Sequence, residues 1–180
     1  MEIITITNRI TLQPITLDDC DKLHDLMKDI YPKVYKYLWK DNGSWYINML
    51  YNPTNIQQEL NEANTVFYFV NFDGEAIGIL RILYHCVYPK FPNLKATKLH
   101  RIYLNPKVIR QGIGKALINW TKVQTEIVGD EILWLEAMNT QPNAVSFYEK
   151  MGFQIGSHVI LPYERLLSDK RGMHQMWLTI

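Results

Sequence analysis

The hydrophobic pattern of the N-terminal part of the chain predicts a strand followed by a helix. Residues 4–7 and 10–12 alternate Ile or Leu with Thr, which predicts a strand. Thr16, followed by Leu17 and two acids, has the pattern of a helix start. We expect Pro32 to end this helix. Its apolar stripe consists of Leu17, Leu23, Leu26, Met27 and Ile30.

From Thr65 onward the pattern is mostly that of strands separated by helices. Asp73-Gly74 predicts a hairpin turn, and Gly152 is expected to stop a short helix. The predicted strands are 66–70, 76–80, 98–104, 131–138, 153–160 and 174–180, and the predicted helices are 52–62, 113–127 and 142–151. We find no internal repeat and no linker, so we expect one mixed α/β domain over residues 1–180.

Composition narrows the class of protein. The 180 residues are 47% hydrophobic and 21% charged, and 19 Lys and Arg oppose 18 Asp and Glu for a net charge of +1. This balance gives no electrostatic reason to expect binding to nucleic acid or to an anionic membrane. We expect neither a membrane span nor a signal peptide, because no long apolar run and no basic N-terminal block occurs.

The cysteines and histidines predict no disulfide and no metal site. Cys20 and Cys86 stand far apart without a metal-ligand spacing, and the five histidines include no HExxH pair. Two unpaired thiols are typical of a reducing compartment, so we expect a cytoplasmic protein.

The most informative segment is the glycine turn that opens the helix at residue 113. A strand ending near Leu104 leads to Gly112-Ile113-Gly114, where Arg110 and Lys115 add positive charge. The first amides of a helix lack internal acceptors and lie at the positive end of its dipole, which suits a phosphate. The segment is neither a Rossmann fingerprint nor a P-loop. A tight turn that needs glycine only for packing is the alternative.

Read together with residues 141–153, this turn resembles the GNAT superfamily of N-acetyltransferases. That family combines a Q/R-x-x-G-x-G/A turn with a later helix carrying N-x-x-A-x-x-F-Y-E-K-x-G-F. Here the two pieces lie at 109–114 and 141–153, and 99–104 is similar to the strand that precedes them. The resemblance implies a central, mostly antiparallel mixed sheet whose middle strands splay apart, flanked by helices, and acetyl-CoA as the acetyl donor without a metal.

The sequence departs from the family pattern at three places. Ile109 replaces the first Gln or Arg of the turn, so its phosphate contact would be absent or supplied by Arg110. Gln141 replaces the first Asn of the second motif, with Asn143 two residues later. His100 stands where the family often has an acid, which leaves the general base open.

The resemblance implies contacts to the cofactor from both motifs and from one strand. In the family, the pantetheine arm inserts between the strands that correspond here to 99–104 and 132–138 and bonds to the backbone. The residues expected to bind acetyl-CoA are therefore Ile102, Tyr103, Leu104, Arg110, Gln111, Gly112, Ile113, Gly114, Lys115, Asn143 and Tyr148.

Tyr148 and His100 are the candidate catalytic residues. The resemblance implies that Tyr148 protonates the departing thiolate, since a phenol is protonated at pH 7. The alternative is that Tyr148 only packs on its helix. His100 is a candidate base because an unperturbed imidazole is mostly neutral at pH 7. It is equally a candidate structural residue, and Glu136 on the facing strand is a further candidate base.

The acceptor site is expected in the aromatic-rich stretch 31–51, which holds seven of the 22 aromatic residues. Residues 18–62 carry eight acids and five bases, so we expect a mildly acidic, aromatic pocket for a cationic small-molecule amine. The layout resembles bacterial polyamine acetyltransferases of the family. We assign Tyr35, Trp39 and Trp45 to this pocket and expect Trp39→Ala and Trp45→Ala to raise the acceptor KM. The alternatives are aromatics that cap the core or form a dimer contact.

Three other functions fit parts of the sequence. The same fold could acetylate a protein or peptide amine, or could bind CoA without catalysis, and a nucleotide binder would use only the glycine turn. A homodimer is one arrangement that the resemblance allows.

Overall fold

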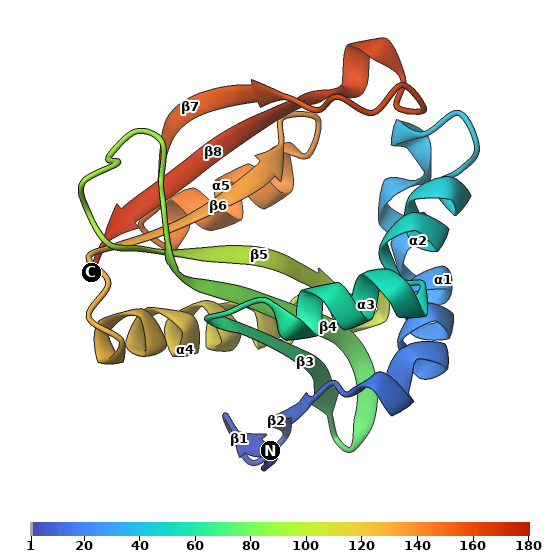
Figure 1. Cartoon of the computed structure of the whole chain (residues 1–180), viewed down its shortest axis with the longest axis horizontal. Coiled ribbons are helices and arrows are strands. Elements are labelled where there is room, and N and C mark those ends of the chain that lie inside the picture. Colours follow the sequence, from blue (N-terminus) through green and yellow to red (C-terminus); the bar gives the residue numbers. More distant parts are fainter. Residues whose placement is uncertain (1) are drawn as a thin grey trace.

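The chain folds around one eight-stranded sheet with the spatial order β1-β2-β3-β4-β5-β6-β8-β7 (Figure 1). This computed structural model describes residues 2–180. The strands are β1 (Ile4–Thr5), β2 (Ile10–Pro14), β3 (Thr65–Phe72), β4 (Glu75–Cys86), β5 (Ala96–Leu104), β6 (Ile132–Met138), β7 (Gln154–Ile160) and β8 (Gly172–Thr179). All neighbouring pairs are antiparallel except β5 and β6.

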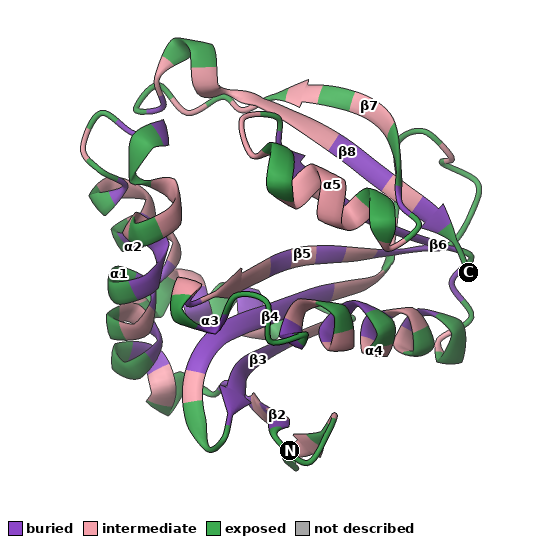
Figure 2. Cartoon of the chain, turned by 180° about the vertical axis from the view of Figure 1, so that it is seen from behind, coloured by how far each residue is buried: buried purple, intermediate pink, exposed green. Residues whose placement is uncertain are grey.

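Five α-helices cover the two faces of the sheet. They are α1 (Cys20–Tyr35), α2 (Ser44–Leu50), α3 (Pro53–Asn61), α4 (Ile113–Ile127) and α5 (Pro142–Lys150). Alternate residues of the strands build two large cores, one beneath α1–α3 and one beneath α4 and α5, and a smaller cluster forms around Tyr88 and Trp134. The strands between these layers are largely buried (Figure 2). This architecture confirms the predicted fold class.

The sheet opens at its centre. β5 and β6 pair only where Ala96–Leu99 lies beside Ile132–Leu135. Beyond Leu99, β5 continues against β4, whereas β6 continues against β8. The two middle strands therefore diverge, as the resemblance implied, and each leaves a backbone edge without a strand partner at the opening.

Several predicted boundaries have the expected local cause. Asn52 caps α3, and its side chain accepts a hydrogen bond of 2.9 Å from the Asn55 amide. Gly152 ends α5 with positive φ, and its amide donates to Glu149 O (2.9 Å). The next amide, of Phe153, donates to Tyr148 O (3.0 Å), which completes a Schellman motif.

Two predictions about elements were wrong, and one helix was not predicted. Pro32 does not end the first helix, because α1 continues to Tyr35, where the rings of Tyr31 and Tyr35 stack one turn apart with centroids 4.9 Å apart. Ser44–Leu50 forms a helix that the aromatic pattern of 31–51 obscured. The N-terminal alternation is a hairpin of two strands, β1 and β2, and not one strand.

Among residues 2–180, no helix is long and apolar enough to cross a membrane. Cys20 and Cys86 are both free thiols. The cytoplasmic location stays a prediction.

Candidate active site

The glycine turn presents the open start of α4 to the surface. Gly112 caps the helix with φ +79°, a left-handed conformation that favours glycine. The first bond inside the helix runs from the Ala116 amide to Gly112 O, so the preceding amides from 113 to 115 have no acceptor within the helix. A Cβ built on Gly112 would meet no atom within 4 Å. The space above these amides is therefore open to a ligand.

The turn packs directly against α5. A Cβ on Gly114 would lie 3.3 Å from the ring of Phe147, so glycine here allows the two helices to approach closely. Lys122 of α4 donates to Met151 O (2.6 Å) at the other end of α5. The two sequence motifs thus form one continuous surface. Arg110, Gln111, Lys115 and Asn143 are all exposed beside it, and Ile109 is 66% exposed.

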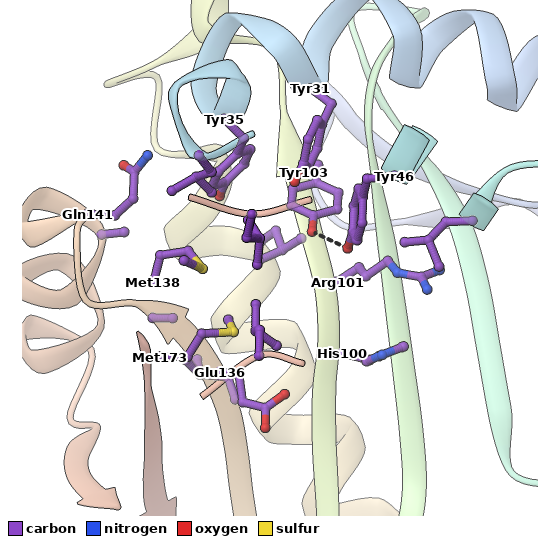
Figure 3. A pocket seen from close by; sticks show the side chains of 18 of the residues that line it. Tyr31, Tyr35, Tyr46, His100, Arg101, Tyr103, Glu136, Met138, Gln141 and Met173 are labelled. Carbon is purple, nitrogen blue, oxygen red and sulfur yellow. Dashed lines mark hydrogen bonds between the residues drawn. The ribbon is translucent and has the colours of Figure 1, made fainter. Parts of the chain in front are cut away.

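A cavity of about 190 Å³ lies where β5 and β6 diverge (Figure 3). One wall is the backbone and side chains of β5 from Leu99 to Tyr103, and the facing wall is β6 from Leu135 to Met138. The remaining walls come from α1, α2, α5 and the connection between β7 and β8. The aromatic side chains that line it are Tyr31, Tyr35, Trp39, Tyr46, Tyr103, Tyr148 and Tyr163.

Tyr148 lies on α5 and lines this cavity, one residue after the Phe147 that contacts Gly114. Burial raises the pKa of its phenol to about 12. Tyr148 is therefore fully protonated at neutral pH, and because the raised pKa makes it a weaker acid, its use as a donor depends on its position beside the departing sulfur.

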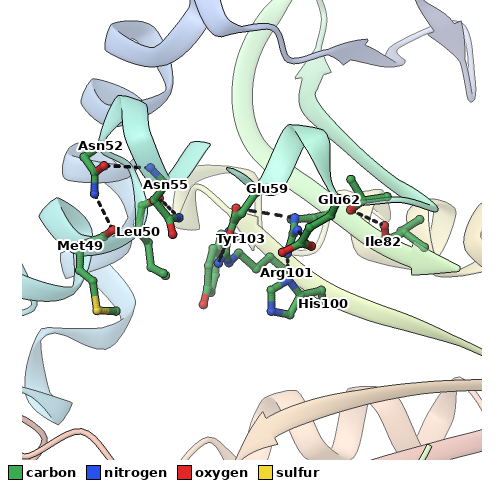
Figure 4. A network of polar contacts seen from close by, with 12 residues as sticks. Met49, Leu50, Asn52, Asn55, Glu59, Glu62, Ile82, His100, Arg101 and Tyr103 are labelled. Atoms are coloured by element: carbon green, nitrogen blue, oxygen red, sulfur yellow. Dashed lines mark hydrogen bonds and ion pairs between the residues drawn. The ribbon is translucent and has the colours of Figure 1, made fainter. Parts of the chain in front are cut away.

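His100 also lines the cavity, but its surroundings do not suit a general base. Its Nδ1 accepts a hydrogen bond from Arg81, so the neutral imidazole carries its proton on Nε2 (Figure 4). Burial, together with the positive charges of Arg101, Arg81 and Lys98, lowers the pKa of His100 to about 2. An imidazole with its pKa lowered in this way accepts a proton less readily, which argues against His100 as the base, and its catalytic role stays a prediction.

Behind His100 lies a buried ion cluster that joins α3 to the sheet (Figure 4). Glu59 of α3 binds Arg101 with two bonds of 2.7 Å and lies 3.6 Å from Arg81 Nε. Arg81 also pairs with Glu62. Both arginines and Glu59 are buried. This cluster was not foreseen, because its members come from three separate segments.

The predicted acceptor residues are only partly brought together. Tyr35 and Trp39 line the cavity, whereas Trp45 packs behind Trp39 with centroids 6.0 Å apart and does not line it. Trp45 instead contacts Tyr163, at 5.6 Å. The lining of the cavity therefore does not support the substrate assignment of Trp45.

The expected acidity of this pocket was also wrong. None of the eight acids of residues 18–62 lines the cavity, and Glu59 is instead neutralised by Arg101. Glu136 is the single carboxylate in the cavity wall among residues 2–180. It bonds to Lys98 (2.8 Å) and Gln175 (3.0 Å).

The cavity also contains residues that the sequence reasoning did not single out. Tyr31 and Tyr46 belong to the aromatic-rich stretch, whose unusual composition was their signal. Tyr163 and Met173 come from the β7–β8 region and had no signal in the sequence. Tyr163 reaches the site because Trp39 pairs with Leu166, and the Lys40 amide donates to Arg165 O (3.0 Å), across the sheet opening. Met173 reaches it because β8 pairs with β6, where Met173 lies opposite Met138.

Solved acetyltransferase structures share this fold at low sequence identity. One is a ribosomal L7/L12 alpha-N-protein acetyltransferase in complex with coenzyme A (13% identical, TM-score 0.74, covering 99% of this chain and 98% of that one). Another is the PaiA N-acetyltransferase of Thermoplasma acidophilum in complex with coenzyme A (18%, 0.71, 95% and 99%). A third is the spermidine N-acetyltransferase of Vibrio cholerae in complex with CoA and spermine (15%, 0.68, 96% and 96%).

Sequence relatives are named as N-acetyltransferases. An uncharacterized N-acetyltransferase of Methanocaldococcus jannaschii is 24% identical over 158 residues, which are 86% of this chain and 65% of the relative. The chain thus spans about two thirds of that protein's length. An uncharacterized N-acetyltransferase of Lactobacillus delbrueckii subsp. lactis is 24% identical over 127 residues, 68% of this chain and 73% of the relative.

The profile of the acetyltransferase (GNAT) family matches residues 21–153, which include the glycine turn, Tyr148 and both diverging strands. The match covers more than half of the chain. The chain therefore belongs to the GNAT acetyltransferase family.

Proposed function

We propose that this protein is an acetyl-CoA-dependent N-acetyltransferase that acts on the primary amine of a small molecule. The observation that carries the proposal is the position of Tyr148, in the wall of the cavity where β5 and β6 diverge. A proton donor, an unpaired strand edge and a phosphate-binding turn then lie along one path. The three structures of similar fold described above contain coenzyme A, which supports the same donor here.

The described residues fit both the pyrophosphate and the pantetheine arm of acetyl-CoA. The amides from 113 to 115 would hold the pyrophosphate, with Arg110, Gln111 and Lys115 at the rim and Asn143 on the adjoining helix. The β5 edge at Ile102, Tyr103 and Leu104 would bond to the pantetheine arm as a neighbouring strand does. When bound, acetyl-CoA supplies a thioester whose carbonyl carbon forms the new C–N bond as its C–S bond breaks.

The acceptor must lose a proton before it can attack. An alkylammonium has a pKa of about 10.4, so exposing the free amine at pH 7 costs about 4–5 kcal/mol. Glu136 is the carboxylate in the cavity wall that could take this proton, directly or through water, once Lys98 or Gln175 releases one of its oxygens. The aromatic walls hold the amine close to the thioester, and this positioning supplies most of the rate.

Tyr148 completes the exchange of protons. Its hydroxyl gives its proton to the thiolate sulfur that departs, which leaves free CoA and an acetamide. The phenolate then regains a proton, by way of solvent, equivalent to the one that the amine lost. The reaction needs no oxidant and no metal for its atoms to balance.

A protein amine is the second candidate acceptor, and one observation favours it. A ribosomal-protein acetyltransferase has the highest TM-score among the three structures described above. Against it, the cavity is lined by side chains on several sides and has a volume of only about 190 Å³, which suits a small molecule. A homodimer stays a prediction.

Calorimetric titration with acetyl-CoA tests the proposed donor. We expect the wild type to bind with micromolar Kd and Gly112→Asp to lose at least tenfold in affinity, because the carboxylate repels the pyrophosphate. Gly112→Asn is the matched control, since it places a neutral side chain of the same shape at the same left-handed φ. No binding by the wild type would overturn the proposal. Equal losses of affinity in both variants would mean that the glycine turn does not bind the pyrophosphate.

A further inference from the structure

The walls of the cavity indicate what kind of amine it accepts. Tyr35 of α1, Tyr46 of α2 and Tyr103 of β5 form one side, and Met138 and Met173 lie below them in Figure 3. Aromatic rings and thioethers pack well against a flat aromatic group, because sulfur and ring edges attract one another. These walls suit a ring better than a flexible chain that carries several charges.

The cavity offers no free carboxylate that could pair with an extra ammonium of the acceptor. Glu136 is the single lining carboxylate within residues 2–180, and Lys98 and Gln175 already bond to its two oxygens. Arg101 is positive and fully engaged by Glu59. A polyamine keeps at least one ammonium after its reacting nitrogen loses a proton, and burying that charge without a partner is costly. A monoamine leaves no buried charge at the moment of attack.

The volume of the cavity and its neutral polar groups further restrict the acceptor. A cavity of about 150 Å³ is known to hold benzene, and the acetyl thioester shares this cavity of about 190 Å³, so the volume left for the acceptor is on the scale of a single ring. The hydroxyls of Tyr46 and Tyr103 lie 3.4 Å apart and can hydrogen-bond to a ring substituent. We infer that the acceptor is a monoamine joined to an aromatic ring by a short chain, as in phenethylamine or tyramine. The inference rests on the proposed function.

An amine panel with saturating acetyl-CoA tests the substrate class. We expect kcat/KM for phenethylamine and tyramine to exceed that for putrescine and spermidine at least tenfold. A preference for either polyamine, or for peptide N-termini, would overturn the inference while leaving acetyl transfer intact. Binding of acetyl-CoA with no turnover on any amine would overturn the proposed function and the inference with it.

Variants of Tyr46 test whether its ring forms the acceptor site. We expect Tyr46→Leu to raise the KM for phenethylamine at least tenfold and to leave the Kd for acetyl-CoA within twofold, because the glycine turn lies elsewhere. Tyr46→Phe keeps the ring and should keep that KM. Tyr84→Leu removes a tyrosine from the core on the opposite face of the sheet and is the matched control. An unchanged KM in Tyr46→Leu would contradict the assignment.

A change of charge without a change of shape tests the electrostatic argument. Gln141 lines the cavity, and Gln141→Glu adds a second carboxylate of the same size at the start of α5, where negative charge is tolerated. We expect the ratio of kcat/KM for putrescine to that for phenethylamine to rise at least tenfold. A ratio unchanged from the wild type would show that missing carboxylates do not exclude polyamines, and would overturn the inference.

Discussion

Tyr148 and His100 line one cavity, yet burial shifts their pKa values in opposite directions. Tyr148 has its pKa raised to about 12 and stays protonated, whereas His100 has its pKa lowered to about 2 and stays neutral. Burial disfavours the charged form in both cases, which is phenolate for one and imidazolium for the other. One residue is therefore kept as a proton donor, and neither is suited to accept the proton of the amine.

Removing the Tyr148 hydroxyl tests the role of the donor. We expect Tyr148→Phe to lower kcat by about 10²–10⁴, the usual contribution of a positioned acid. The Kd for acetyl-CoA should not change, because the ring and its packing are kept. Steady-state kinetics and calorimetry measure the two quantities, and a kcat within twofold of the wild type would remove Tyr148 from the mechanism.

The lowered pKa of His100 predicts a loss of stability in acid. The folded chain binds fewer protons at His100 than the unfolded chain, whose histidine has a pKa of about 6.5. Its contribution is therefore complete above about pH 6.5 and is lost as pH falls toward the folded value, by up to about 1.4 kcal/mol per pH unit. We expect urea unfolding between pH 7.5 and 4.5 to show a shallower decline in His100→Gln. Parallel curves would contradict the shift.

At the scale of elements, the decisive feature is a strand pairing that stops. β5 and β6 are hydrogen-bonded only from Ala96 to Leu99 on β5, and their divergence exposes polar backbone to the opening. Backbone edges of this kind readily accept a further strand-like partner. The connection between β7 and β8 crosses to Trp39 and closes the cavity on the far side.

Hydrogen exchange tests whether this edge holds the donor. We expect saturating CoA to slow exchange at one or more amides of Ile102, Tyr103 and Leu104. Amides within Ala96–Leu99 are the internal control, because β5 there is already paired on both sides. Unchanged exchange at all three residues, with CoA bound, would place the pantetheine arm elsewhere.

For the whole molecule, the Glu59 cluster fixes the helical layer to the sheet. Glu59 lies on α3, while Arg81 and Arg101 come from β4 and β5. Because the charges are buried, losing one partner leaves another uncompensated. The cluster lies beside His100 and so helps to define the wall of the cavity.

Breaking this cluster should destabilise the fold. We expect Glu59→Gln to lower the free energy of unfolding by about 3–5 kcal/mol at pH 7, measured by urea denaturation. Glu62→Gln is the matched control, with an expected loss below about 1 kcal/mol, since the side chain of Glu62 is 51% exposed. Equal losses of unfolding free energy in the two variants would mean that burial does not decide how much stability each ion pair contributes.

The order of elements in the second half, the glycine turn and Tyr148 could all be predicted from the amino-acid sequence. These features depend on local causes: hydrophobic period, the left-handed Gly112 and Gly152, and residue types at fixed short spacing. Pro32 shows the limit of such rules, since packing of Tyr31 and Tyr35 carries α1 past it. Which side chains line the cavity depends on contacts between distant segments. Glu59 counted as acidity from its position in the chain, but Arg101, 42 residues away, neutralises it, and Trp45 does not line the cavity although Trp39 does. The charge of a cavity and the set of side chains that line it depend on partners from distant segments, which no local pattern encodes.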